Sequence, residues 1–295
     1  MSSPLAGRIV VVTGAARGLG AGLAEGLARR GARVALVDLE PAELAAVSAR
    51  CPGSAWFEVD VTDGAGLARV AASVAEQLGP ASVVVANAGI AAGGSLLVAD
   101  AAAYDRVIEV NLLGSIRTVR AFLPQVVQTQ GYVLQVASLA ALVPMPLMSA
   151  YCASKSGVEA FALSVRGEVA PFGAAVGVGY LSWTDTDMVR GADAVPGLRD
   201  LRAGIPGVLG RTYPLGPVVS RFVAGIEARS PRVYGQRWLS TLALLRGCLP
   251  WALAHAPAAK RRDLEKAMHQ VSTSGTMPVG AGGAADTAAR EGAHD

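Results

Sequence analysis

Short and almost wholly apolar runs recur along the chain, and they limit its fold more than any other feature. Seven of them are rich in β-branched residues, at Arg8–Thr13, Arg33–Asp38, Ala55–Val59, Ser82–Ala86, Gly131–Ala137, Ala175–Leu181 and Pro231–Gly235. Strands that are buried on both faces of a parallel sheet have this pattern. Longer stretches with helical spacing separate them, at about Leu19–Arg30, Gly66–Leu78, Tyr104–Val127 and Ala153–Ala170. This alternation predicts an α/β fold, a doubly wound parallel sheet of seven strands with helices on both faces.

The first apolar run ends in a glycine-rich turn, Thr13-Gly14-Ala15-Ala16-Arg17-Gly18-Leu19-Gly20. Glycines permit positive φ angles, let the backbone approach a pyrophosphate, and bring the N-terminus of the following helix to the phosphate oxygens. A position between a strand and a helix separates this turn from an ordinary tight turn. The turn therefore predicts a Rossmann-type dinucleotide site.

An acidic residue closes the second apolar run. Asp38 lies 18 residues beyond Gly20, where a carboxylate can accept hydrogen bonds from both hydroxyls of the adenosine ribose and would repel a 2′-phosphate. Arg17 has the opposite tendency, because a guanidinium in the turn can pair with that phosphate. Since Asp38 would face the phosphate directly, NAD is predicted as the cofactor in preference to NADP.

A tyrosine and a lysine lie four residues apart in Tyr151-Cys152-Ala153-Ser154-Lys155. On a helix they share one face, so the ammonium is expected beside the phenol, where it would lower a pKa that is ordinarily about 10. Such a tyrosine can serve as a general acid or base near neutral pH. Ser138 ends the fifth predicted strand and is placed to hold a substrate oxygen, while Asn111 lies on the helix before that strand.

In this order, these motifs resemble those of the short-chain dehydrogenase/reductase family, in its branch with a TGxxxGxG turn and a YxxxK motif. The resemblance covers about Gly7–Met188. It implies hydride transfer between NAD and a secondary alcohol or ketone, with Tyr151 as the general acid or base. It also implies that Ser138 orients the substrate oxygen, that Lys155 binds the nicotinamide ribose and sustains the phenolate, and that Asn111 holds a water of the proton relay.

The resemblance further implies which residues contact the cofactor. Asp60 and Val61 follow the third strand at the adenine, and Thr186 follows the sixth strand at the nicotinamide carboxamide. The full set is Gly14, Ala16, Arg17, Gly18, Leu19, Gly20, Asp38, Leu39, Asp60, Val61, Asn87, Ala88, Gly89, Tyr151, Lys155 and Thr186. No metal is expected, because the three cysteines are widely separated and the three histidines lie near the C-terminus, away from these motifs.

Two features depart from the family pattern. Leu181 and Ser182 occupy the positions of a Pro-Gly pair ahead of Thr186, which puts in doubt the backbone at the nicotinamide. Arg232-Val233-Tyr234 replaces the glycine-rich C-terminal strand through which family members form tetramers. A homodimer is therefore expected.

The segment between Ser138 and Tyr151, LAALVPMPLMSA, is apolar throughout. The family folds this segment over its substrate, so a lipophilic small molecule is expected, such as a steroid-like, long-chain or polyketide-like compound, and no nucleic acid. Candidate contacts are Ser138, Leu139, Met145, Met148 and Trp183. The alternative for these side chains is packing in the core. Alternatives for the whole chain are an NADPH-dependent ketoreductase, a non-catalytic NAD-binding scaffold or sensor, and a protein of the membrane surface.

Three parts are expected along the chain. Residues 1–236 form a single Rossmann-type catalytic domain with a Gly- and Pro-rich substrate loop at about 187–217, residues 237–271 form a helical extension, and residues 272–295 form a disordered tail. Eight basic and two acidic residues lie between 229 and 270, among leucines and two tryptophans. Such a stretch suits peripheral contact with an anionic bilayer through 237–271, and it equally suits packing on the domain or across a dimer.

The start of the chain, MSSPLAGRIVVVTG, lacks the order of basic, apolar and small residues of a secretory signal. No window of the sequence reaches about 18 uninterrupted apolar residues. A cytoplasmic location is expected, with membrane association through the extension as the alternative.

Overall fold

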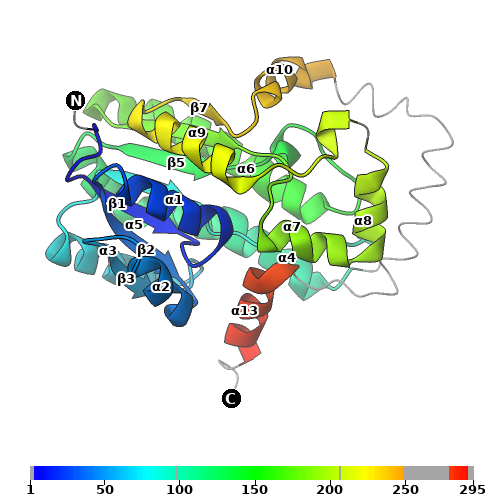
Figure 1. Ribbon diagram of the computed structural model, residues 1–295, viewed down its shortest axis with the longest axis horizontal. Coiled ribbons are helices and arrows are strands. Elements are labelled where there is room, and N and C mark those ends of the chain that lie inside the picture. Colours follow the sequence, from blue (N-terminus) through cyan, green and yellow to red (C-terminus); the bar gives the residue numbers. More distant parts are fainter. Residues whose placement is uncertain (1–2, 98, 206, 249–278, 292–295) are drawn as a thin grey trace.

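Seven parallel strands form one sheet in a computed structural model that describes residues 3–97, 99–205, 207–248 and 279–291 (Figure 1). Their order is β3-β2-β1-β4-β5-β6-β7, and each pair of neighbours is parallel. The strands are β1 (Ile9–Thr13), β2 (Arg33–Asp38), β3 (Ala55–Glu58), β4 (Val83–Ala86), β5 (Tyr132–Val136), β6 (Ala175–Tyr180) and β7 (Arg232–Tyr234). The predicted fold class is confirmed, and each strand lies within a predicted run.

Helices cover both faces of the sheet. Alternate residues of β1 divide between two apolar cores, with Val11 in one and Val10 and Val12 in the other. The Val10 core packs against α1 (Gly18–Ala28), α2 (Pro41–Ser48) and α9 (Leu215–Glu227). The Val11 core packs against α3 (Gly64–Gln77), α4 (Ala101–Ile108), α5 (Ser115–Gln128) and α6 (Ser149–Val169). Because both faces are buried in this way, the strands read as continuous apolar runs.

Two short helices occupy the predicted substrate loop. They are α7 (Asp187–Ala194) and α8 (Pro196–Ala203), followed by a 3-10 turn, η4 (Gly207–Leu209). The extension begins with α10 (Trp238–Leu245) and the turn η5 (Arg246–Cys248). Residues 249–271 of the predicted extension lie outside the described residues. No helix in the described part of the chain combines the length and apolar character needed to cross a membrane.

The prediction of a disordered tail is wrong for residues 280–291. They form a helix, α13 (Gly280–Glu291), which packs beside α7 (Figure 1). Its composition is dominated by Ala and Gly, so it has little apolar surface to bury. The helix is held instead by a close backbone contact and by a buried ion pair, both described below.

Candidate active site

The glycine-rich turn forms a backbone cradle at the end of β1. Gly14 has a φ of +66°, and a Cβ on Gly20 would lie 1.9 Å from the carbonyl oxygen of Gly14. A side chain at Gly20 would therefore clash with the backbone of the turn. Gly14, Gly18 and Gly20 line one cavity of about 250 Å³. Asn87, after β4, donates from Nδ2 to the carbonyl oxygens of Thr13 and Gly14 at 2.9 and 3.2 Å. This turn, at a helix N-terminus and on the wall of the cavity, fits the pyrophosphate of a dinucleotide.

Acidic groups surround the place where the adenosine ribose is expected. Asp38 ends β2, where it accepts hydrogen bonds from the backbone N–H groups of Ala16 and Leu39 at 2.9 and 2.7 Å. Burial raises the pKa of Asp38, and these two hydrogen bonds partly offset that effect. Arg17 donates to both oxygens of Glu40, with Nη2 to Oε2 at 2.6 Å and Nε to Oε1 at 2.9 Å. Its guanidinium is therefore already paired with a carboxylate of this chain.

Tyr151 and Lys155 lie on the first turns of α6, which begins after the apolar segment that follows β5. The ammonium Nζ of Lys155 lies 5.8 Å from the centre of the Tyr151 ring and donates to the carbonyl oxygen of Val136 at 3.0 Å. A Cβ on Gly89 would lie 3.4 Å from this Nζ and 3.0 Å from Oδ1 of Asn111. The structure thus brings together residues from the ends of β4 and β5 and from α6.

The expected lowering of the Tyr151 pKa is not found in the chain alone. Burial raises the pKa of Tyr151 to about 12, and a hydrogen bond with Ser138 opposes this only in part. Burial also lowers the pKa of Lys155 to about 8. The loss of water solvation disfavours the charged form of each group, and this effect outweighs their mutual proximity. With a pKa of about 12, the phenol is protonated at neutral pH.

Asn111 and Ser138 complete the group predicted from the sequence. Asn111 lies in a π-helical turn, η1 (Glu109–Gly114), and such turns are frequent at functional sites. Its Nδ2 donates to the carbonyl oxygen of Ile90 at 2.9 Å and to Oγ of Ser154 at 3.1 Å, while its Oδ1 accepts from the N–H of Ile90 at 2.8 Å. Ser138 caps a 3-10 turn, η2 (Leu139–Ala141), and lines the cavity together with Tyr151.

The segment after β6 is held without the Pro-Gly pair of the family. The backbone N–H of Ser182 donates to Oε1 of Gln236 at 2.9 Å, so a buried glutamine after β7 fixes the chain at this point. Thr186 lies at the N-terminus of α7 and lines the cavity, and its Cγ2 would contact a Cβ on Gly18 at 3.3 Å. The sequence did not indicate Gln236, which is an isolated polar residue beyond a strand.

The apolar segment between Ser138 and Tyr151 divides between the two roles that the sequence left open. Leu142 and Leu147 pack in buried clusters away from the cavity. Met145 lines the cavity, and Leu139 and Met148 line it while they also pack in buried clusters. Trp183 lines the same cavity and packs beside Met145 and Met148. The guanidinium carbon of Arg202, on α8, lies 5.3 Å from the centre of the Trp183 ring.

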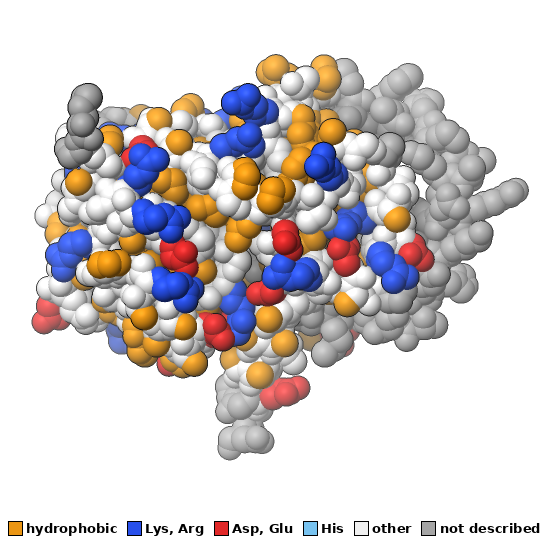
Figure 2. Space-filling view, viewed as in Figure 1, with side chains coloured by type: hydrophobic (Ala, Val, Ile, Leu, Met, Phe, Trp, Pro, Cys, Tyr) orange, Lys and Arg blue, Asp and Glu red, His pale blue; other side chains and the backbone are white. Residues whose placement is uncertain are grey.

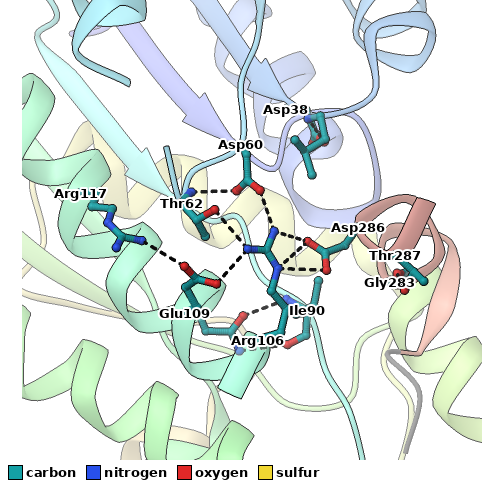
Figure 3. A network of polar contacts seen from close by, with 12 residues as sticks. Asp38, Asp60, Thr62, Ile90, Arg106, Glu109, Arg117, Gly283, Asp286 and Thr287 are labelled. Atoms are coloured by element: carbon teal, nitrogen blue, oxygen red, sulfur yellow. Dashed lines mark hydrogen bonds and ion pairs between the residues drawn. The ribbon is translucent and has the colours of Figure 1, made fainter. Parts of the chain in front are cut away.

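The cavity walls include residues that the sequence did not single out. Apart from Ala16, every cofactor residue predicted from the resemblance lines the cavity, and Ala16 instead holds Asp38 through its backbone N–H. Gly282, Ala285 and Asp286 of α13 also line it. Asp286 pairs with Arg106 of α4, which bonds Asp60 as well (Figure 3).

Comparison with known proteins indicates a family. A model of short chain dehydrogenases matches residues 8–195. The 2-(S)-hydroxypropyl-CoM dehydrogenase 3 of Xanthobacter autotrophicus is 36% identical over 54% of this chain and 64% of its own length. Estradiol 17-beta-dehydrogenase 11 of Macaca fascicularis is 32% identical over 56% of this chain and 57% of its own length. The matched region thus spans less than two thirds of each of these relatives.

A solved structure has the same fold. The short chain dehydrogenase/reductase of Burkholderia phymatum in complex with NAD superimposes with a TM-score of 0.73 at 23% identity, covering 84% of this chain and 96% of that chain. At this identity the likeness concerns the fold alone.

Proposed function

Since the chain belongs to the short-chain dehydrogenase/reductase family, we propose that it transfers a hydride between NAD(H) and a secondary alcohol or ketone. The observation that carries this proposal is one cavity shared by the glycine turn and by Ser138, Tyr151 and Lys155. Asn111 does not line this cavity itself, but its side chain is hydrogen-bonded to the backbone of Ile90, which does. Family membership supplies the reaction class, and these residues supply the chemistry that the reaction needs.

Each residue has a defined task in the proposed mechanism. When bound, the nicotinamide supplies or accepts the hydride. Tyr151 donates its phenolic proton to the carbonyl oxygen during reduction, and takes the proton back from the hydroxyl during oxidation. Ser138 orients that oxygen by a hydrogen bond. Lys155 holds the nicotinamide ribose and favours the phenolate, and Asn111 supports the proton relay.

The proposed cofactor is NAD rather than NADP. Asp38 and Glu40 both line the ribose end of the cavity, so a 2′-phosphate would meet two carboxylates. Arg17 is the cation that could pair with a 2′-phosphate. Its guanidinium is already paired with Glu40 at 2.6 Å and with Glu43 at 3.2 Å, which supports NAD further. Thr186 is proposed to hold the carboxamide, and Asp60 and Val61 the adenine.

The proposed substrate is lipophilic. Met145, Met148 and Trp183 line the cavity near Tyr151, together with Leu139. These side chains offer adaptable apolar surface to a steroid-like, long-chain or polyketide-like compound.

Two proposals concern assembly. The first is a homodimer, from the missing glycine-rich C-terminal strand. The second is peripheral contact of residues 237–271 with an anionic membrane. Within the described part of this extension Leu239 is buried, while Leu244 and Leu245 are exposed. The exposed pair supports the second proposal, and the buried residue supports packing on the domain.

The test of the proposed function has two stages. A panel of steroids, long-chain secondary alcohols, polyketide-like ketones and small hydroxy compounds is first screened by NADH absorbance. With any substrate found, Tyr151→Phe should lower kcat by orders of magnitude while NADH still binds, because only the ionisable oxygen is removed. Near-normal turnover of this variant would refute the role of Tyr151. An intact protein that binds NADH but turns over nothing in the panel would favour a scaffold or sensor.

A further inference from the structure

The C-terminal helix α13 begins in close contact with the substrate side of the cavity. The N–H of Val279, just before the helix, donates to the carbonyl oxygen of Ala91 at 2.8 Å, and the Val279 side chain is buried beside Leu147 and Leu198. A Cβ on Gly191 of α7 would lie 2.3 Å from the backbone nitrogen of Gly280. This backbone contact between α7 and α13 requires glycine, and it fixes the start of α13 on the helix that follows Thr186.

The middle of α13 is fixed at the opposite end of the cavity by an ion network (Figure 3). Nη2 of Arg106 lies 2.6 Å from Oδ1 of Asp286 and 2.6 Å from Oδ2 of Asp60. Nε of Arg106 also donates to Asp286, and Nη1 donates to Thr62 and Glu109 at 3.1 Å each. The Arg106 and Asp286 side chains are only 8% and 3% exposed. Removal of Arg106 would leave Asp286 as a buried carboxylate without its ion partner, whereas removal of the Asp286 charge would leave Arg106 paired with Asp60 and Glu109 and would detach α13 from the network.

Helix α13 therefore connects the two ends of the cavity. Its start packs on α7, beside the residue proposed to hold the nicotinamide carboxamide. Its middle pairs with the arginine that bonds Asp60, the proposed adenine contact. Between them, Gly282, Ala285 and Asp286 line the cavity itself. Their small side chains close the wall while filling little of the space.

We propose that α13 is part of the dinucleotide site, and that it slows release of the cofactor by closing the cavity through the Asp286–Arg106 pair. This inference rests on the proposed function, since it takes NAD(H) as the ligand. In the proposed state, Asp286 acts as a positioning residue. It holds Arg106, which in turn orients the Asp60 carboxylate toward the adenine end. Loss of the pair should free α13 without touching Ser138, Tyr151 or Lys155.

The experiment measures NADH release by stopped-flow fluorescence, with excess NAD as the competitor. The variants are Asp286→Asn, a chain ending at residue 278, and Glu291→Gln, which removes one exposed carboxylate from the same helix as a matched control. Asp286→Asn and the shortened chain should both release NADH about tenfold faster or more, because the cover that slows release is lost. Glu291→Gln should release it at the rate of the unmodified protein. Thermal melting confirms that each variant is folded.

A second variant tests whether α13 faces the cofactor. Ala285→Leu keeps the ion pair and places a larger side chain into the cavity, so it should weaken NADH binding in a fluorescence titration. Unchanged NADH affinity in this variant would overturn the proposal, as would an unchanged release rate in Asp286→Asn. Tighter NADH binding by the shortened chain would also overturn it, because α13 would then obstruct the site.

These results separate the two proposals. If the full chain binds NADH and the release rates do not change, the role of α13 is refuted while the proposed function stands. If the full chain binds no NADH, both are refuted.

Discussion

Lys155 should make cofactor binding depend on pH in a range where an ordinary lysine would not titrate. Its pKa is lowered to about 8 by burial. If only the ammonium form holds the ribose well, the apparent Kd for NADH rises as pH passes upward through this value. At pH 7 about nine tenths of the protein carries the ammonium, and at pH 9 about one tenth does, so the Kd should rise about tenfold between these two points.

Other titratable side chains lie close to Lys155 on α6. Tyr151 and Cys152 precede it on α6, and burial raises the pKa of each above its ordinary value, which moves their titration away from neutral pH. Glu159 lies one turn further on, where it accepts hydrogen bonds from Tyr180 at 2.7 Å and Arg246 at 2.6 Å.

The assay is a titration of NADH fluorescence at fixed ionic strength, repeated from pH 6.5 to pH 9.0. Lys155→Met serves as the control, because it keeps the length of the side chain and removes the titrating group. The variant should bind NADH more weakly at pH 7 and show little dependence on pH. The reasoning would be refuted if the Kd of the unmodified protein stayed constant up to pH 9. It would also be refuted if the Kd of Lys155→Met rose with pH by the same factor as that of the unmodified protein.

Two further predictions concern the cofactor and the extension. In Asp38→Ala the ratio of the Kd for NADP to the Kd for NAD should fall, since the variant removes repulsion of the 2′-phosphate and also loses ribose hydrogen bonds. If the unmodified protein binds NADP and NAD with comparable Kd values, Arg17 rather than Asp38 decides the choice of cofactor. The full chain should sediment with anionic liposomes at low salt and be released at high salt, because surface attraction is screened over about 8 Å at physiological ionic strength; failure to sediment at low salt would leave residues 237–271 as a lid or dimer element.

The sheet and the group around Tyr151 were predictable because they depend on local patterns. Strands that are buried on both faces must be apolar on both faces, so their runs are visible in the sequence. In a parallel sheet the ends of the strands meet at one edge. Motifs at the ends of β1, β4 and β5 could therefore be expected to converge with Tyr151 and Lys155, although they lie far apart in the chain.

Helix α13 was not predictable in the same way. Its sequence, GAGGAADTAARE, contains no large apolar side chain, which is typical of a disordered tail. Its place depends on the backbone contact with Gly191 of α7 and on the pair between Asp286 and Arg106, whose positions differ by 180 residues in the sequence. A single aspartate among alanines does not indicate an ion-pair partner so far away in the sequence. Ala is nevertheless the strongest helix former, so the helical state of this segment had a local signal that composition obscured.

The raised pKa of Tyr151 could not be predicted from the sequence. The spacing of Tyr151 and Lys155 shows that their side chains share one helix face, but not how far burial removes them from water. Tyr151 and Lys155 do share a face of α6, yet both are buried, and burial raises the phenol pKa to about 12. A phenol with this pKa is ready to donate a proton to a ketone at neutral pH, whereas its service as a base requires added positive charge nearby. The oxidised nicotinamide ring is cationic, so its binding would supply such charge in the direction of alcohol oxidation only. We therefore expect the rate of alcohol oxidation to depend more strongly on raised pH than the rate of ketone reduction.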